Sequence, residues 1–441
     1  MKRPPGPSSL KLIRRLIATR GNLLTIMQEL ADRYGDVVRA KVGPSTFYLI
    51  NHPDLIEEVL VTHEDRFVRV EGERRVSGRL VDRGLFTTEG EDHLRRRDVM
   101  ESVMYRSAAP ASTRNVVDLA LALAKDNEDG ETVELFGWME SFTTAVIMQV
   151  LFGKGPQEQR GRDLAKAITN TIAQMDAMPV PFTSLPERFP KLQRRFLKER
   201  ARLDALILAE IQEHRADPTK DDVLSLLIAA GSIEGPHPLS DADLRDELVS
   251  LFRGHQAVST ALTWTFFQLA SLPEIEVQVQ AEADSYDPMS LRFEDMATLD
   301  MCRRVFEESL RLYPPAYVLA RTSIQDHMAG GYVIPKGSRI LVSEWVAHRD
   351  TRFWTDPTRF DPDRFYGSNA SSRPEFSYFP QGGGKKMCMG RHFVRPMEGP
   401  ILLASLARIW KMTLVPNKPV QLSAKATLKP KNGVWVTLHR R

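Results

Sequence analysis

The stretch Phe379-Pro-Gln-Gly-Gly-Gly-Lys-Lys-Met-Cys388-Met-Gly390 governs the interpretation of the whole chain. Its three consecutive glycines permit tight turns with positive φ angles that other residues resist. Cys388 stands where this loop is expected to enter a helix from Arg391 onward, and the free amides at a helix start favour a thiolate over a thiol. Cys388 is therefore a candidate metal ligand, and the alternative is an ordinary turn before a helix.

The surroundings of Cys388 resemble the haem-binding loop of the cytochrome P-450 family, in which this cysteine is the axial thiolate. Further motifs of that family stand upstream in the family's order. They are Ala261-Leu-Thr-Trp264, Phe306-Glu-Glu308-Ser-Leu-Arg311-Leu-Tyr-Pro-Pro and Phe360-Asp-Pro-Asp-Arg364-Phe365. The resemblance implies the cytochrome P-450 fold, which is mainly α and helix-rich with small peripheral β-sheets. It predicts an N-terminal extension over residues 1–21 and a single domain over residues 22–441.

The resemblance also implies haem b as the cofactor and assigns residues to it. His93 and Arg97, at i,i+4 on one helix face, are expected to reach the haem propionates together with Arg321 and Lys386. Glu308, Arg311 and Arg364 are expected to form a buried network that supports the haem loop. The loop itself is represented by Gln381, Gly384 and Gly390, and here Gln381 replaces the family's usual Phe while Lys386 replaces its usual Arg or His. An amide near the sulfur could change the iron's potential.

The long helix capped by Ser240 and ending before Pro273 departs from the family at its oxygen-activation segment. The family has an acid followed by an alcohol, which deliver protons to bound oxygen. Here Gln256 stands for the acid and Ala257 for the alcohol, and Thr260 is the candidate substitute on the same face. Arg253 takes the place of a residue that packs close to the haem. It could bind a substrate carboxylate, steady a peroxide or form a salt bridge along the helix.

Two functions from one fold are therefore open, with a third in reserve. The first is a monooxygenase that hydroxylates or epoxidises an apolar or amphipathic small molecule with O2 and electrons from a separate ferredoxin or flavodoxin. The second is an atypical member that works without the acid–alcohol pair, by peroxide-driven oxidation or by rearrangement, dehydration or oxidative coupling in natural-product biosynthesis. The third is a haem-binding sensor or carrier without turnover. A basic face formed by Lys385, Lys386, Arg391, Arg95 and Arg96 is the candidate surface for an acidic electron donor.

The composition is that of an ordinary globular protein, with 42% hydrophobic residues among 441 and a formal net charge of +3. This balance argues against a nucleic-acid partner. Cys302 is expected to be a buried small hydrophobe, and two cysteines imply no disulfide framework. No transmembrane segment is expected, and the expected state is a cytoplasmic monomer. The basic, amphipathic start at Lys11 is interpreted as a solvated helix, with a membrane-surface role as the alternative.

Periodicity predicts the remaining elements. A helix over Asn22–Tyr34 is followed by paired strands over Asp36–Val42 and Thr46–Asn51 and a helix over Pro53–Thr62. Phe67–Leu85 is predicted to be an irregular loop, which by the resemblance would cover the substrate pocket, and Val116–Glu213 to be mainly helical. A Pro-rich break from Met178 is predicted to separate two helices, and the resemblance implies that it forms a lid over the distal pocket. Met175, Met178 and Phe182 are expected either to line a substrate channel or to pack in the core. Strands are predicted over Tyr332–Ile334, Ser338–Val342 and Gly433–Leu438.

Overall fold

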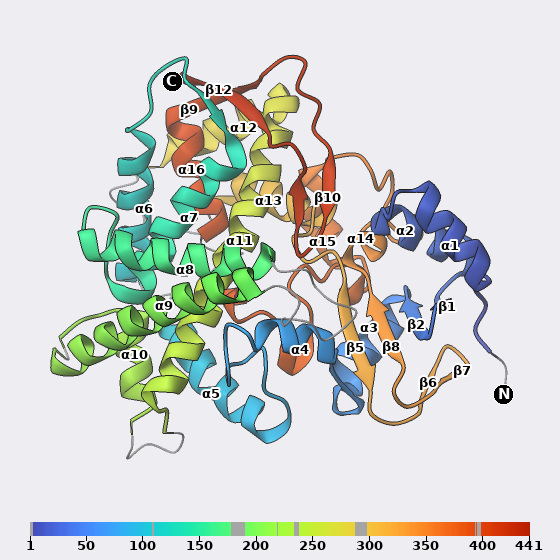
Figure 1. Cartoon of the computed structure of the whole chain (residues 1–441). Helices are drawn as coiled ribbons and strands as arrows, with labels where there is room; N and C mark the ends of the chain where they lie inside the picture. Colours follow the sequence, from blue (N-terminus) through green and yellow to red (C-terminus); the bar gives the residue numbers. More distant parts are fainter. Residues whose placement is uncertain are drawn as a thin grey trace.

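The chain folds into a large helical part and a smaller β-rich part that lie beside each other (Figure 1). The computed structural model describes residues 3–107, 110–177, 190–217, 219–232, 238–286, 298–392, 394 and 398–441. The helical part contains α5–α13 and α16, while α1–α3 and α14 accompany the main sheet. This arrangement confirms the predicted mainly helical fold with small peripheral sheets.

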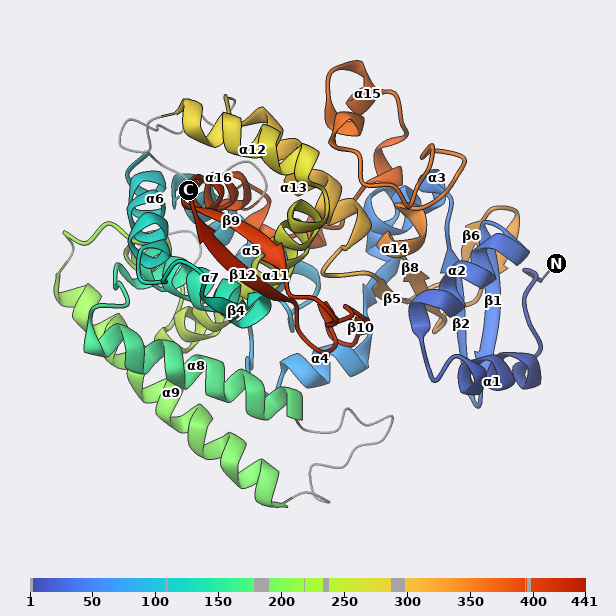
Figure 2. The same ribbon diagram turned by 90° about the horizontal axis from the view of Figure 1, so that it is seen from above.

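The helical part surrounds α11 (Asp241–Ser271), which lies between α7 and α13 when seen from above (Figure 2). The other helices of this part are α5 (Gly90–Ser107), α6 (Pro110–Ala124), α7 (Leu135–Phe152), α8 (Gln159–Ala177), α9 (Pro190–Ala216), α10 (Val223–Ala230), α12 (Pro273–Ser285), α13 (Asp300–Leu312) and α16 (Gly399–Ile409). Ser240 and Asp243 form a capping box that fixes the start of α11. Because α11 is packed by neighbours on most sides, its apolar residues are spread around the helix instead of forming one stripe.

The β-rich part is built on a five-stranded sheet in the order β1-β2-β8-β5-β3. Its strands are β1 (Val37–Val42), β2 (Ser45–Ile50), β8 (Arg339–Val342), β5 (Leu319–Ser323) and β3 (Phe67–Arg69). Strands β2 and β8 are parallel, so residues near the N-terminus pair with residues some 290 positions later. Strand β3, directly before α4 (Glu71–Ser77), pairs antiparallel with β5, and this pairing positions the cationic residues described below.

Smaller sheets and short helices complete the described part of the chain. The sheets are β4 (Thr132–Glu134) with β12 (Trp435–Arg440) and β9 (Trp410–Leu414), β6 (His327–Ala329) with β7 (Tyr332–Ile334), and β10 (Leu422–Ala424) with β11 (Leu428–Pro430). The helices are α1 (Ser9–Ala18), α2 (Leu23–Tyr34), α3 (Pro53–Glu57), α14 (Glu344–Ala347) and α15 (Ser368–Ser371). Strand β4 lies inside the stretch predicted to be helical, because its partner β12 comes from the far end of the chain.

The structure corrects two other local predictions. Phe67–Leu85 is not irregular throughout, since it contains β3 and α4. The backbone directly after Cys388 forms a 3-10 turn over Met389–His392 where a regular helix was expected from Arg391, and α16 covers Gly399–Ile409. The predicted helix Pro53–Thr62 is confirmed, although its second half is a π-helix. The Pro-rich break with Met178 and Phe182 lies outside the described residues, whereas Met175 is buried in the core.

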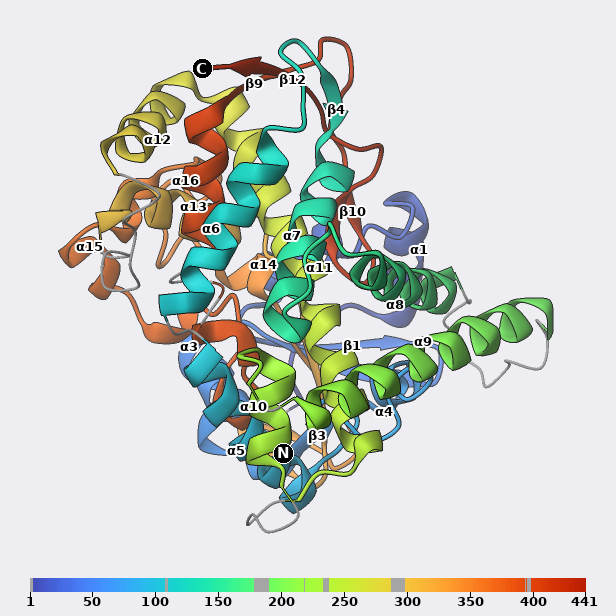
Figure 3. The same cartoon turned by 90° about the vertical axis from the view of Figure 1, so that its left-hand side faces the viewer.

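One described helix, α7, is long and apolar enough to cross a membrane by length and composition alone. It packs along α11 (Figure 3), and Thr143 of α7 shares a 2.7 Å hydrogen bond with Ser259 of α11. Both hydroxyls are completely buried. The apolar character of α7 is thus explained by its place in the core. Cys302 is likewise buried in the core, which confirms the prediction for that residue.

Glu398, directly before α16, makes stability depend on pH. It is 4% exposed, and burial raises the pKa of its carboxyl to about 8. Because this exceeds the unfolded value of about 4.3, the folded state binds the proton more tightly. Its stabilising contribution is full below about pH 4.3 and is lost as pH rises towards about 8.

We expect Glu398→Gln to remove part of that loss of folding stability, measured by urea unfolding across this pH range. The exposed Glu375→Gln is the control, and an equal pH dependence in Glu398→Gln and wild type would contradict the assignment.

Candidate functional site

The loop before Cys388 is held against the β-rich part by contacts that leave no room for a side chain at Gly384. Gly384 has a φ of +66°, and a Cβ there would lie 2.0 Å from the Leu60 carbonyl oxygen. The next amide, Lys385 N–H, donates to Glu64 Oε2 at 2.7 Å. The Cys388 amide donates to the Gln381 carbonyl at 2.9 Å, which closes the loop. A glycine is therefore required at Gly384 for the loop to adopt this path.

Two side chains from α5 hold the same loop from the other side. His93 Nε2 donates to the Lys385 carbonyl at 3.1 Å, and Arg97 Nη1 donates to the Met387 carbonyl at 2.8 Å. Burial, followed by the nearby Arg69, lowers the pKa of His93, so its ring is neutral and uses its N–H on the loop. The other ring nitrogen, Nδ1, is buried without a partner among the described residues. In this structure His93 and Arg97 therefore position the backbone around Cys388.

The Cys388 thiol is accessible to a small probe, yet the surrounding protein desolvates it. Both properties hold when the sulfur faces a space inside the fold. Burial raises the pKa of the thiol, while the Gly390 amide opposes that rise. A local amide thus favours the thiolate as expected, but burial outweighs it. A cationic metal bound to the sulfur would have to supply the missing stabilisation.

The central helix α11 has an opening in the middle of an otherwise covered stretch. Between Asp243 and Ala270, only Gly254 and Ala257 are exposed. A Cβ built on Gly254 would meet no atom within 4 Å. Because these residues are three apart, they lie on one face of the helix. This face therefore borders open space at the segment that the sequence singled out as the oxygen-activation segment.

Cationic side chains gather near the Cys388 loop with too few carboxylates to neutralise them. Arg69, on β3, is directly opposite Arg321, on β5, in the antiparallel register. Arg69 and Lys386 share one carboxylate, Glu89, at 3.6 and 3.1 Å. Arg321 makes no ion pair with any described residue, although it is only 8% exposed. Like charges directly opposite each other destabilise a sheet, so this arrangement calls for an anion that the protein itself does not provide.

Burial lowers the pKa values of all three cations in this cluster. Burial is the main reason that the pKa of Arg69 falls to about 10, and the Arg321 and Arg97 charges contribute to the fall. Burial also lowers the pKa of Lys386 and of Arg321. A bound anion would reverse these effects. Arg69 was not singled out by the sequence, because only the strand pairing β3–β5 brings it beside Arg321.

A buried network connects α13 to the start of the Cys388 loop. Arg311 and Glu308 form two hydrogen bonds of 2.7 Å, and both side chains are completely buried. Arg311 also donates to the carbonyls of His348, Pro357 and Arg359. His348 Nε2 in turn accepts the Phe379 amide at 3.1 Å. His348 is thus a link between the network and the loop that motif spacing did not indicate.

Arg364 joins this network more loosely. Its Nε lies 3.4 Å from Glu308 Oε1, and its Nη2 donates to the Asp356 carbonyl at 3.0 Å. Burial raises the pKa of Glu308 while Arg311 opposes that rise. The three residues grouped by resemblance are therefore in contact, with Arg311 as the centre.

The remaining distal residues do not share one role. Gln256 Nε2 donates to Glu140 Oε1 of α7 at 3.4 Å. The Thr260 hydroxyl donates back to the Gln256 carbonyl at 2.8 Å and is completely buried. Arg253 reaches Ser77 Oγ of α4 at 3.3 Å and makes no ion pair with a described residue. His255 is buried, and burial lowers its pKa to about 4.

The predicted basic face is wrong as a continuous surface. Arg96 is 1% exposed and binds Asp243 and Glu247 at the start of α11. Lys386 is turned inward to Glu89. The other members are Arg95, Arg391 and Lys385, and each is paired with an acid: Asp92, Glu101 and Glu64. Sequence proximity suggested a shared face, but the helix rotation at α5 buries Arg96.

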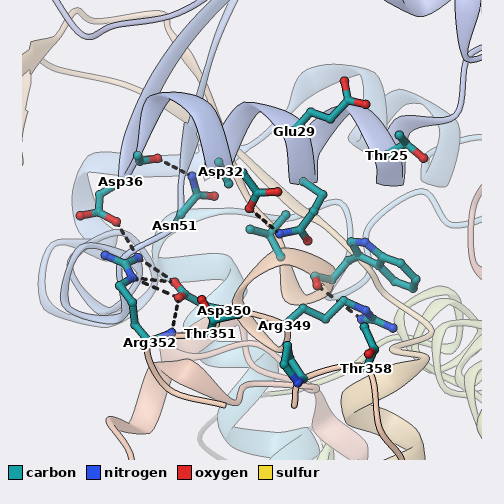
Figure 4. Close-up of a pocket in the computed structure, with 16 residues that line it drawn as sticks. Thr25, Glu29, Asp32, Asp36, Asn51, Arg349, Asp350, Thr351, Arg352 and Thr358 are labelled. Atoms are coloured by element: carbon teal, nitrogen blue, oxygen red, sulfur yellow. Dashed lines mark hydrogen bonds and ion pairs between the residues drawn. The ribbon is translucent and has the colours of Figure 1, made fainter. Parts of the chain in front are cut away.

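A separate pocket of about 880 Å³ lies between α2, α14 and the segment after α14 (Figure 4). Several of its charged side chains pair with one another, since Arg352 binds Asp36 at 2.7 Å and Asp350 at 2.6 Å. Gln28 Nε2 donates a hydrogen bond to Asp32 Oδ1. The pocket includes no residue of the Cys388 loop or of α11. It carries no sign of the chemistry that the Cys388 region offers.

The family model named Cytochrome P450 matches residues 4–436. The chain belongs to the cytochrome P-450 family. Among its relatives, cyclooctat-9-en-7-ol 5-monooxygenase of Streptomyces melanosporofaciens is 29% identical over 93% of this chain and 90% of that protein. Pentalenene oxygenase of Streptomyces avermitilis is 28% identical over 90% of this chain and 88% of its own. The chain is therefore a cytochrome P-450 monooxygenase-type enzyme.

Solved cytochrome P-450 structures have the same fold. The haem domain of cytochrome P-450DA superposes with a TM-score of 0.86 at 21% identity, covering 100% of this chain and 98% of that one. A retinoic acid-bound cyanobacterial CYP120A1 gives 0.82 at 24% identity, with 100% of both chains covered. The family implies a haem-thiolate cofactor. The site fits such a group, because it combines an accessible thiol, open space beside α11 and unneutralised buried cations suited to haem propionates.

Removing Arg311 or Glu308 should leave an unpaired buried charge. Such a loss costs about 3–5 kcal/mol, and it also releases His348 and Phe379. We expect Glu308→Ala and Arg311→Ala to give poorly folded, haem-free protein, measured by circular dichroism and by the haem-to-protein ratio. Arg364→Ala is the matched comparison, with a smaller loss because its contact is longer. Normal haem content in either of the first two variants would contradict this account.

Proposed function

We propose that this protein is a haem-thiolate monooxygenase that holds haem b through Cys388 and oxidises an apolar or amphipathic small molecule. The observation that carries the proposal is the excess of buried cations around a loop with an accessible cysteine, in a chain of this family. The relatives named for cyclooctat-9-en-7-ol and pentalenene favour a terpene as substrate and a role in secondary-metabolite biosynthesis.

The residues would divide the work of binding the haem as follows. Arg69, Arg321 and Lys386 would neutralise the propionates, and Glu89 would keep the cations apart when the haem is absent. His93 and Arg97 would fix the backbone that presents Cys388. When bound, the haem iron supplies the oxygen activation, and the thiolate donates electron density that favours O–O cleavage. Gln381, beside the loop closure, would tune that donation.

On the distal side, the chain's own groups would bring protons to the opening at Ala257. Gln256 cannot transfer a proton as a carboxyl does. Its side-chain amide, however, donates a hydrogen bond to the carboxyl of Glu140. Glu140 is half-buried, so solvent water can reach its carboxyl. The space left by Ala257 can hold water that carries the proton onward. Glu140 would thus supply the acid that α11 lacks.

The alternative function keeps a specific observation in its favour. The Thr260 hydroxyl is buried and bound to the Gln256 carbonyl, so it is not free to replace the missing alcohol. An enzyme with no alcohol at this position would suit peroxide-driven oxidation, or rearrangement, dehydration or oxidative coupling. Arg253 would then have room to steady peroxide or a substrate carboxylate, since no acid among the described residues neutralises it.

Electrons would come from a separate ferredoxin or flavodoxin, and the enzyme would act as a cytoplasmic monomer. The exposed Lys385 and the half-buried Arg391 beside the Cys388 loop are the surviving candidates for contact with an acidic donor. Both side chains are paired with acids. They would therefore attract an acidic electron donor more weakly than unpaired basic residues would.

Two oxidation regimes test the function directly. The purified haem protein is given either peroxide alone or oxygen, reduced nicotinamide and a surrogate ferredoxin chain, with a generic reporter substrate. Wild type and Ala257→Thr are compared. Turnover only with the electron chain supports the monooxygenase. The peroxide-driven function would replace the monooxygenase if peroxide alone gives turnover and Ala257→Thr improves only the oxygen-driven reaction.

Glu140→Gln tests the proton route. We expect the oxygen-driven yield of product per reduced nicotinamide to fall by about one to two orders of magnitude, with a changed solvent isotope effect. The peroxide-driven rate and the haem content should stay unchanged. The exposed Glu128→Gln is the control. Undiminished coupling in Glu140→Gln would exclude this carboxyl from the route.

A further inference from the structure

The first helix, α1, carries a row of apolar side chains that nothing in the described structure covers. Leu10, Ile13 and Ile17 are 60%, 39% and 73% exposed. Their spacing of three and then four residues places them on one face of the helix. Leu12 alone is buried and anchors α1 to the protein. Leucine and isoleucine exposed in a row differ from apolar residues scattered singly, which need no explanation.

The charges of α1 are all of one sign. The segment from Ser8 to Asn22 contains basic residues but no Asp or Glu. Arg15 is the one that forms an ion pair, with Glu29 of α2. Lys11, Arg14 and Arg20 are exposed and make no ion pair with a described residue. The exposed face of α1 is therefore apolar with a cationic border.

A groove of about 360 Å³ lies between α1 and α2, on another side of α1 from the exposed apolar row. Leu12, Ile26 and Leu30 line it together with Lys11, Arg14 and Arg33. Arg15 and Glu29, which form an ion pair with each other, also line it. Figure 2 shows α1 at the outer edge of the β-rich part, away from the helices that surround α11.

We propose that α1 docks this protein onto a membrane surface that contains anionic lipids. Leu10, Ile13 and Ile17 enter the boundary between headgroups and acyl chains, and Lys11 and Arg14 bind lipid phosphates. Charge complementarity selects an anionic bilayer over a neutral one and over a second copy of α1, which would bring like charges together. The proposal favours the membrane-surface alternative over the solvated helix. It does not depend on the haem chemistry.

Cosedimentation of the full-length holoprotein with vesicles tests the proposal. We expect binding to vesicles of phosphatidylcholine with phosphatidylglycerol, weak binding to phosphatidylcholine alone, and loss of binding at high salt. Lys11→Gln with Arg14→Gln should weaken binding about fivefold for each charge removed. Ile13→Ser with Ile17→Ser should abolish it. Because all four side chains are exposed, the variants should retain wild-type thermal stability.

The controls are matched in exposure. Val277→Ser, at a 62% exposed position on α12, and Lys125→Gln, at an exposed position after α6, should bind vesicles as wild type does. Equal binding of wild type and the α1 variants would overturn the proposal, and so would no binding to anionic vesicles. Light scattering measures the oligomeric state and so tests whether a second copy of the protein covers α1 instead. A dimer that dissociates in Ile13→Ser with Ile17→Ser, without vesicle binding, would show that the face belongs to a second copy.

Discussion

The structure around Cys388 depends on one buried ion pair, Glu308 with Arg311. Two charges without access to water are tolerated only when their hydrogen bonds are complete. Arg311 satisfies this condition by donating to three backbone carbonyls beyond Glu308, and it thereby fixes the segments that lead to the Cys388 loop. His348 passes this constraint to Phe379, where the loop begins. The position of the thiol is thus set by contacts far from it in sequence.

A second constraint acts from the opposite side of the loop. Arg69, Arg321 and Lys386 are brought together by strand pairing, with Glu89 as the single carboxylate that pairs with two of them. Burying like charges is unfavourable unless an anion completes the set. A haem with two propionates would do so, and it would restore the pKa values that burial lowers. Binding of the cofactor and stability of the fold should therefore be coupled.

The sequence predicted the parts of the site that depend on local spacing. The Cys388 loop, the Glu308–Arg311 pair on one helix and the long helix capped by Ser240 all follow from residues close together in the chain. Arg69 and His348 could not be found this way, because their partners lie about 250 and 30 residues away and are brought together by the sheet and by the loops. The burial of Arg96 was missed for the same reason, since its partners are on α11.

The account's central claim is that Cys388 ligates a haem between its loop and the open face of α11. The absorption spectrum of the reduced, carbon monoxide-bound protein measures this most directly, with wild type compared with Cys388→Ser. The account predicts the absorption maximum typical of thiolate-ligated haem in wild type and its loss in Cys388→Ser, through a changed ligand or an empty site. The same thiolate-type spectrum in both proteins would contradict it.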